Sequence, residues 1–327
     1  MDIFLSTLQQ MLMMFILMTV GFILRKLSAL PENSSSTLSK LETFLFVPAL
    51  NLYTQMTKCT VKTFAENSAL ILYGAITLAA GMALAYPLSR LFIRKADGNP
   101  EREYQRNIYK YAMTFGNYGF MGNFIILGVF GEEMFFKYSL FTLIVGIVCS
   151  SWGLFILIPK DKSAGTWANL KKGIITPPTI ALVLGITLGL LNVGQYAPDF
   201  LTNAMNEAAK CQGPVAMVLA GFVIGGYKFT SLLTDKKVYI ATALRLIAIP
   251  AAMMLVMKAI SLKFTGINDE VMTLALITFA TPLGLNTIVY PAAYGGDTKT
   301  GASMAMISHT LSVITIPLMY LLFIVVL

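Results

Sequence analysis

The chain is a series of apolar stretches, each about as long as a lipid bilayer is thick. A helix needs about 20 apolar residues to cross the hydrocarbon core, and backbone polar groups must be satisfied within it. Of the 327 residues, 56% are hydrophobic and 12% are charged, whereas soluble domains average about 25% charged. The sequence therefore predicts an all-α polytopic membrane protein without a sizeable soluble domain. Hydropathy and helix breakers place ten transmembrane helices at 3–26, 38–57, 68–93, 107–130, 134–158, 174–193, 199–226, 237–260, 269–294 and 299–326.

Lysine and arginine are distributed unevenly over the connections between these spans. The odd-numbered connections hold 17 of them and the even-numbered connections hold 5. By the positive-inside rule the odd-numbered connections are cytoplasmic. The protein is thus expected in the plasma or inner cell membrane, with both termini extracellular or periplasmic. The net charge of +8 then reflects orientation, and no nucleic-acid partner is expected.

The two halves of the chain share their helix breakers. Four pairs of residues recur at offsets of 163 to 167 positions, at matching places in a five-span unit. The pairs are Pro31 and Pro198, Pro48 and Pro214, Pro87 and Pro250, and Gly131 and Gly295. Since five is odd, the second unit must insert upside down. We expect two inverted repeats, 1–160 and 171–327, joined by a cytoplasmic linker at 161–170; chance alignment of the prolines is the alternative.

The fourth and ninth spans are interrupted. Phe279–Tyr294 reads FATPLGLNTIVYPAAY, and Phe115–Gly131 reads FGNYGFMGNFIILGVFG. Proline and glycine disfavour a continuous helix, and a broken helix is tolerated at membrane depth only where protein encloses it or it lines a cavity. The start of a half-helix can bind an anion, and two interrupted spans in corresponding halves indicate a transporter's binding site. Two kinked helices without a substrate are the alternative.

Polar residues at the interruptions are the candidate substrate ligands. An asparagine amide donates to a carboxylate or accepts from a hydroxyl without adding charge to the membrane interior. The expected binding residues are Asn117, its counterpart Thr281, and Gly116, Tyr118, Pro282, Asn286 and Asn123, with Asn51 and Gln55 on the opposite wall. For each asparagine, a helix cap that satisfies the broken backbone is the alternative.

Five of the ionisable residues inside the spans are candidates for a functional or structural role. Glu207 and Lys210 share a helical face and are expected to pair, either as a coupling couple or as a structural pair. His309 is a candidate for proton coupling, although a hydrogen-bonded packing role fits it better. Arg245 is interpreted as a snorkelling side chain or a latch to backbone carbonyls in preference to an anion ligand, and Glu42 as an interfacial residue.

Several segments together resemble one known family. They are TVGFILRKL (Thr19–Leu27), GNYGFMG (Gly116–Gly122), PPTIALVLGITLG (Pro177–Gly189), LRLIAIP (Leu244–Pro250) and ATPLGLNTIVYPAAYGGD (Ala280–Asp297). In order and spacing they resemble the auxin efflux carrier family, which includes plant PIN transporters and bacterial malate or malonate carriers. The chain departs from bacterial relatives at Gly122-Asn123-Phe124, where a proline is usual, so its fourth-span break must rely on glycines.

The resemblance implies a fold of ten helices with broken, crossing helices 4 and 9. Spans 1, 2, 6 and 7 would form a scaffold domain and spans 3–5 and 8–10 a transport domain, and the protein would be a homodimer. The implied activity is transport of small organic anions such as malate, malonate or auxin-like acids.

These observations favour a secondary transporter that works by alternating access, as an elevator, at a mid-membrane helix crossover. The chain has no GxxxxGK[ST] motif, so energy must come from an ion gradient, the membrane potential or the substrate gradient. No cofactor or metal is expected. The alternative is a sodium-coupled carrier resembling bile-acid symporters, although the crossing regions lack acidic residues. An intramembrane enzyme is a remote alternative, because no nucleophile has a positioned base.

Overall fold

The computed structural model describes residues 2–93, 99–157, 176–262, 266–288 and 299–326. Within these residues the regular structure is helical, apart from one isolated antiparallel β-bridge between Gly116 and Leu283. The all-α class expected of a multi-pass membrane protein is therefore confirmed. In the described part of the chain, five helical segments are long and apolar enough to cross a membrane: Phe4–Lys26, Val61–Phe92, Asp199–Gly225, Lys236–Ser261 and Lys299–Phe323. A sixth candidate is the pair Tyr118–Phe141 and Leu143–Leu157, bent by 54°.

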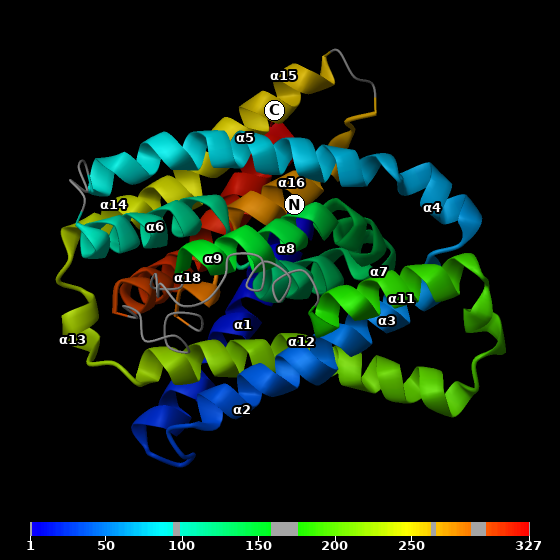
Figure 1. The fold of residues 1–327 in the computed structure, drawn as a ribbon, viewed down its shortest axis with the longest axis horizontal. Helices are drawn as coiled ribbons and strands as arrows, with labels where there is room; N and C mark the ends of the chain where they lie inside the picture. Colours follow the sequence, from blue (N-terminus) through cyan, green and yellow to red (C-terminus); the bar gives the residue numbers. More distant parts are fainter. Residues whose placement is uncertain (1, 94–98, 158–175, 263–265, 289–298, 327) are drawn as a thin grey trace.

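The elements of the first half are α1 (Asp2–Lys26), α2 (Ser34–Leu41), η1 (Glu42–Phe46), α3 (Val47–Lys58), α4 (Val61–Asn67), α5 (Ala69–Phe92), α6 (Pro100–Thr114), η2 (Tyr118–Gly122), α7 (Asn123–Phe141), α8 (Leu143–Val148), η3 (Cys149–Gly153) and α9 (Leu154–Leu157). Those of the second half are α11 (Pro177–Leu190), η4 (Val193–Tyr196), α12 (Asp199–Gly225), α13 (Phe229–Leu232), α14 (Lys236–Ala243), η5 (Leu244–Ala248), α15 (Ile249–Ser261), α16 (Asp269–Ala280), α18 (Lys299–Tyr320) and η6 (Leu321–Val326). Figure 1 shows their arrangement.

Capping residues define where several helices begin. Asn99 precedes α6, and its side chain accepts hydrogen bonds from the N–H groups of Glu101 and Arg102. Thr176 and Asn268 cap α11 and α16 in the same way. Side-chain oxygens at this position satisfy N–H groups that have no partner within the helix. The cap at Asn99 explains why α6 begins at Pro100, ahead of the start predicted at residue 107.

Two helices widen into π-helical turns just before a proline. The N–H of Val47 reaches back five residues to the carbonyl of Glu42, ahead of Pro48. The N–H of Ile249 reaches back to Leu244 in the same way, ahead of Pro250. Proline has no N–H to offer the preceding turn, and local π-helical adjustment satisfies the carbonyls that it leaves free. These widened turns hold Glu42 and Arg245, the two Asp, Glu, Lys or Arg side chains that are completely buried among the described residues.

Two groups of helices pack closely among themselves, and α1 also lies against α18, which joins the two groups. In one group α1 lies along α12, and α3 lies against α11 and α12. The close approach of α1 and α12 requires glycine, because a Cβ atom on Gly21 would lie 2.1 Å from the carbonyl oxygen of Val218, and one on Gly221 would lie 1.8 Å from that of Met18. Small residues let membrane helices approach in this way. In the other group α5 packs on α6 and α7, and α16 packs on α15 and α18.

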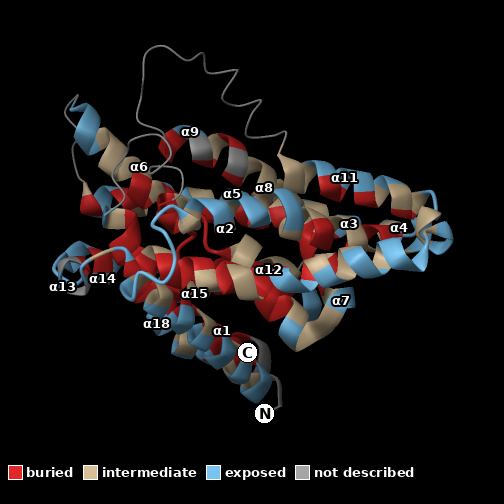
Figure 2. Cartoon of the chain, turned by 90° about the horizontal axis from the view of Figure 1, so that it is seen from below, coloured by how far each residue is buried: buried red, intermediate tan, exposed pale blue. Residues whose placement is uncertain are grey.

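The outer surface of the bundle is apolar. Ile16, Leu72, Leu255 and Ile314 are each at least 60% exposed, and exposed faces run along α1, α5 and α11 in Figure 2. A soluble monomer rarely exposes so much contiguous apolar surface. This surface is suited to contact with lipid hydrocarbon.

Candidate substrate-binding site at a helix crossover

Two helices break and meet inside the bundle. α6 ends at Thr114, and η2 begins at Tyr118. α16 ends at Ala280, and helical structure resumes at Asn286. The extended residues between these helices form the bridge from Gly116 to Leu283, and the N–H of Asn117 donates to the carbonyl of Pro282 at 2.7 Å. The interruptions expected in the fourth and ninth spans are therefore present, and the backbones pair where they cross.

The helical segment that follows the break in the fourth span ends abruptly at Gly131. Within α7, Gly131 has φ 81° and ψ −175°, a conformation that is accessible to glycine but strained for other residues. It separates the residues after η2 from the apolar stretch that leads into α8. The boundary predicted between residues 130 and 134 lies at this glycine.

The side chain of Arg245 binds backbone carbonyl groups at the crossover. Its side chain is completely buried, with Nε 3.3 Å from the carbonyl oxygen of Thr281 and Nη1 3.1 Å from that of Met113. Weaker contacts reach the carbonyls of Thr114 and Thr278. These carbonyls belong to the C-terminal ends of the two half-helices, where the helix dipole favours a cation. The latch interpretation of Arg245 is confirmed, and snorkelling is wrong.

Gly116 is needed for this latch. A Cβ atom at this position would lie 2.1 Å from Nη2 of Arg245 and 2.4 Å from Oγ1 of Thr281. Both neighbours are held by hydrogen bonds, so neither has room to move aside. The glycine thus lets the guanidinium group approach the crossover from one side while a cavity lies on the other.

His309 orients Asn117. Nδ1 of the buried His309 lies 2.7 Å from the carbonyl oxygen of Ala305, and Nε2 lies 3.2 Å from Nδ2 of Asn117. A carbonyl only accepts, so Nδ1 carries the proton and Nε2 accepts from the asparagine amide. One N–H of Asn117 is therefore committed to the histidine. The hydrogen-bonded packing role expected for His309 is confirmed, and a role in proton coupling is untested.

A cavity of about 420 Å³ opens beside the crossover. The residues expected at the site that line it are Gly116, Asn117, Tyr118, Asn123, Asn286 and Asn51. Asn286 also donates to the hydroxyl of Tyr111 at 2.9 Å, which fixes its amide. The structure therefore brings together amides from both broken helices and from α3.

Three expected binding residues lie outside the cavity lining. Thr281 and Pro282 form the crossover backbone, where their carbonyls accept from Arg245 and Asn117. Gln55 is completely buried and donates to Oγ of Ser139 at 2.5 Å. Ser139 lines the cavity, so Gln55 supports its wall without being part of it.

The start of α11 forms a wall of the cavity that was not expected from the sequence. Thr176 and Thr179 line the cavity, together with Thr43 of η1. Nδ2 of Asn51 donates to the carbonyl of Pro178 at 3.2 Å, which joins α3 to this wall. A threonine followed by two prolines is typical of a helix start, and that signal could have placed these residues at a helix N-terminus.

The cavity is lined by apolar side chains and by polar side chains that carry no charge. None of the described residues that line it is Asp, Glu, Lys, Arg or His. The starts of η2 and of the helical residues after Leu285 line it instead. The start of α11 also lines it but offers no free N–H group, because Pro177 and Pro178 have none and the N–H of Thr179 donates to Thr176. Helix N-termini carry partial positive charge and N–H groups without helical partners, and both favour an anion.

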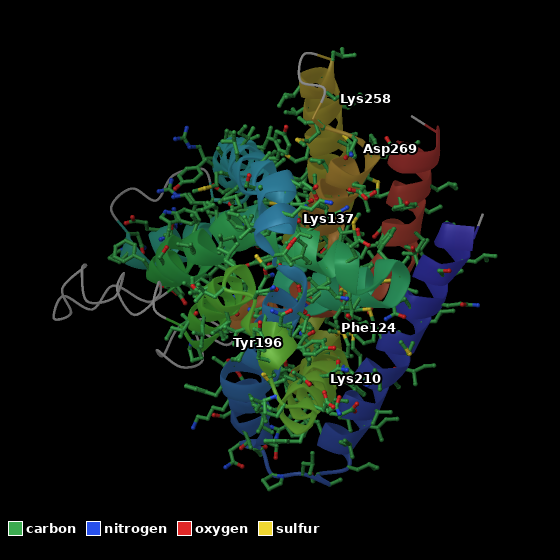
Figure 3. All side chains as sticks on the ribbon, turned by 90° about the vertical axis from the view of Figure 1, so that its right-hand side faces the viewer. Phe124, Lys137, Tyr196, Lys210, Lys258 and Asp269 are labelled. Carbon is green, nitrogen blue, oxygen red and sulfur yellow. The ribbon has the colours of Figure 1, made fainter. Side chains whose placement is uncertain are left out.

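Glu207 and Lys210 do pair, at 2.6 Å, but not at the cavity. Their side chains are 70% and 61% exposed on α12, and Figure 3 shows Lys210 on the surface. The interpretation of Glu42 as an interfacial residue is wrong, since its side chain is completely buried. Packing of η1 against α12 encloses it.

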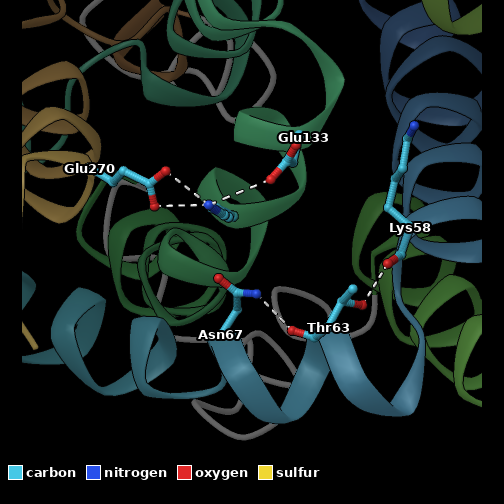
Figure 4. A network of polar contacts seen from close by, with 6 residues as sticks. Lys58, Thr63, Asn67, Glu133 and Glu270 are labelled. Carbon is cyan, nitrogen blue, oxygen red and sulfur yellow. Dashed lines mark hydrogen bonds and ion pairs between the residues drawn. The ribbon is translucent and has the colours of Figure 1, made fainter.

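Ion pairs join the helices at another part of the surface. Nζ of Lys137 lies 2.8 Å from a carboxylate oxygen of Glu270 and 3.7 Å from one of Glu133 (Figure 4). Lys58, at the end of α3, lies 3.2 Å from Glu132. Within the described residues no group of three or more histidine, cysteine or acidic side chains is placed to hold a metal ion.

Comparison with known proteins gives matches along nearly the whole chain. The family model described as "Membrane transport protein" matches residues 6–320. An "Uncharacterized transporter" from Methanothermobacter thermautotrophicus is 22% identical over 319 residues, which is 97% of this chain and 98% of that protein. "Uncharacterized transporter MJ1031" from Methanocaldococcus jannaschii is 24% identical over 94% of this chain and 96% of its own. "Uncharacterized transporter YfdV" from Escherichia coli K12 is 25% identical over 61% of this chain and 62% of its own.

Proposed function

Because this chain belongs to the auxin efflux carrier family of membrane transport proteins, we propose that it is a secondary transporter of small organic anions. The substrate binds in the 420 Å³ cavity beside the crossover. The observation that carries this proposal is the pairing of two broken helices at Gly116 and Leu283, with amide side chains from both helices in the cavity. Broken helices of this kind form the binding sites of secondary transporters.

The charge distribution supports an anionic substrate. Asn117 and Asn123 supply amide N–H donors, and the helix starts at η2 and after Leu285 supply partial positive charge. Arg245 lies directly behind Gly116 and adds a full positive charge that no described carboxylate neutralises by an ion pair. A carboxylate in the cavity would therefore be attracted without a direct ion pair.

The proposed architecture is ten spans in two inverted repeats. The α1, α3, α11 and α12 group serves as the scaffold domain, and the group around α5–α9 and α14–α18 as the transport domain. The cavity reaches Thr43 and Thr176, which lie toward the connections assigned to the cytoplasm. Contacts from Gln55 to Ser139 and from Lys58 to Glu132 join the two groups on the opposite side. The protein would then face the cytoplasm, with both termini outside and a homodimer formed through the scaffold.

A ligand screen on purified protein tests the function. Malate, malonate, citrate and aromatic carboxylates would be compared with neutral analogues by thermal unfolding, since a ligand of the folded state raises stability by mass action. We expect at least one carboxylate to stabilise the protein when its neutral analogue does not. Stabilisation by neutral analogues alone would reject the proposed anion carrier, and stabilisation by a carboxylate only when sodium is present would favour the sodium-coupled alternative.

A further inference from the structure

One buried acidic side chain, that of Glu42, belongs neither to the cavity lining nor to the crossover. Glu42 opens the π-helical turn η1, and its side chain is completely buried. Neither carboxyl oxygen has a hydrogen-bond partner. Ser39 and Thr43, on the same helix, line the cavity. Glu42 thus adjoins the cavity wall in the sequence, while its carboxyl group lies in packed protein.

An ionised carboxylate is not stable in such a place. Removing a charge from water costs several kcal/mol unless a counter-charge or hydrogen bonds compensate. Buried acidic residues are accordingly found paired in nearly all proteins. Without a partner, Glu42 must be neutral, so its carboxyl group carries a proton in this conformation.

No ionisable group on the neighbouring elements offers compensation. η1 packs against α2, α3, α11 and α12. The ionisable residues of α2 and α3 are Lys40, Tyr53 and Lys58, and Lys58 pairs with Glu132. α11 carries no ionisable side chain, and α12 carries Asp199, Glu207, Lys210 and Cys211. Glu207 and Lys210 pair with each other, and neither they nor the others form a hydrogen bond or ion pair with Glu42.

The local backbone provides a route to the cavity. A π-helical turn holds one residue more than the α-helical turn that it interrupts, and such turns occur frequently at functional sites. Thr43, the next residue in this turn, already lines the cavity. A displacement of the turn that brings the carboxyl group of Glu42 to the cavity would let water accept its proton.

We propose that Glu42 is a proton-binding site that couples transport to proton movement. The inference rests on the proposed function, because it assumes that the cavity opens alternately to the two sides. A carboxylate oxygen of Glu42 takes a proton from water on one side, and the O–H bond breaks to return it to water on the other. The pair Glu207 and Lys210, expected from the sequence to serve coupling, is exposed and already compensated.

Infrared spectroscopy tests the proton without requiring a substrate. Wild-type protein should show the C=O band of a protonated carboxyl group that lacks hydrogen bonds, at neutral pH. We expect the band to disappear in Glu42→Gln and to remain in the matched control Glu66→Gln, at an exposed position of α4. Absence of the band from wild-type protein, or its persistence in Glu42→Gln, would overturn the assignment.

Coupling is tested in proteoliposomes that contain a pH-sensitive dye. Malonate, malate or phenylacetate is added outside, and proton and anion fluxes are recorded. Glu42→Gln should still exchange the anion, while its proton flux falls to that of protein-free liposomes; Glu66→Gln should behave as wild type. Wild-type proton flux in Glu42→Gln would overturn the proposal. Absence of anion flux from wild type with all three probes would count against the proposed function, and the infrared band would then decide whether Glu42 holds a proton.

Discussion

Replacement of Asn117 by alanine should weaken substrate binding. The asparagine lies in the break of the fourth span and lines the cavity. One of its N–H groups is committed to Nε2 of His309 at 3.2 Å, because Nδ1 of that histidine donates to Ala305. The second N–H and the carbonyl oxygen are the groups that a ligand can reach. The change therefore deletes at most one donor and one acceptor, and no charge.

The size of the effect follows from this geometry. One hydrogen bond to a charged partner contributes about 1.5–3 kcal/mol, and one to a neutral partner about 0.5–1.5 kcal/mol. Since about 1.4 kcal/mol is tenfold in affinity, Asn117→Ala should weaken the binding of a carboxylate by about ten- to a hundredfold. His309 also loses a partner, so the variant should unfold at a somewhat lower temperature. Asn117→Asp should bind an anion more weakly still, because it adds a negative charge to the cavity.

Isothermal titration with the best carboxylate from the ligand screen measures the dissociation constant. Asn67→Ala is the matched control, because Asn67 donates only to the carbonyl of Thr63 in the short helix α4 (Figure 4). It should bind the carboxylate as wild type does. Unchanged affinity in Asn117→Ala, with a folded protein, would refute the placement of the substrate beside the crossover.

Three further predictions concern the latch, the charged pair and the orientation. Gly116→Ala should destabilise the protein by about 1–3 kcal/mol, as overpacking does in cores. Thermal unfolding measures this, and an unchanged unfolding temperature would mean that the guanidinium group of Arg245 can move aside. Neutralising Glu207 or Lys210, singly or as Glu207→Gln with Lys210→Met, should leave transport near the wild-type rate, because the pair is exposed and lies away from the cavity; a large loss from a single change that the double change restores, in flux assays of folded variants, would instead give the pair a role in coupling. Asn99→Cys, in a Cys211→Ser background, should resist an impermeant thiol reagent in intact cells, and labelling there would reverse the assigned topology.

The breaks in the two helices could be predicted from the sequence, but the side chains that surround them could not. Prolines and glycines act on their own backbone, so the interruptions at Gly116 and Pro282 were predictable from local rules. The approach of His309 to Asn117, 192 positions apart, depends on how α18 packs, and no local pattern encodes that packing. The burial of Glu42 has the same origin, because an acid near a predicted helix end is exposed or enclosed according to its neighbour α12.

The latch also has an electrical consequence. Arginine stays protonated in proteins. Arg245 donates hydrogen bonds to carbonyl groups of both α6 and α16. If the crossover moves during transport, the positive charge of Arg245 must therefore move with it. Under the proposed alternating access, the empty crossover would carry one positive charge, and binding of a monoanion would cancel it. A membrane potential does about 2.3 kcal/mol of work on a unit charge per 100 mV. We therefore expect voltage to act on the return of the empty carrier, while the loaded step is electrically silent.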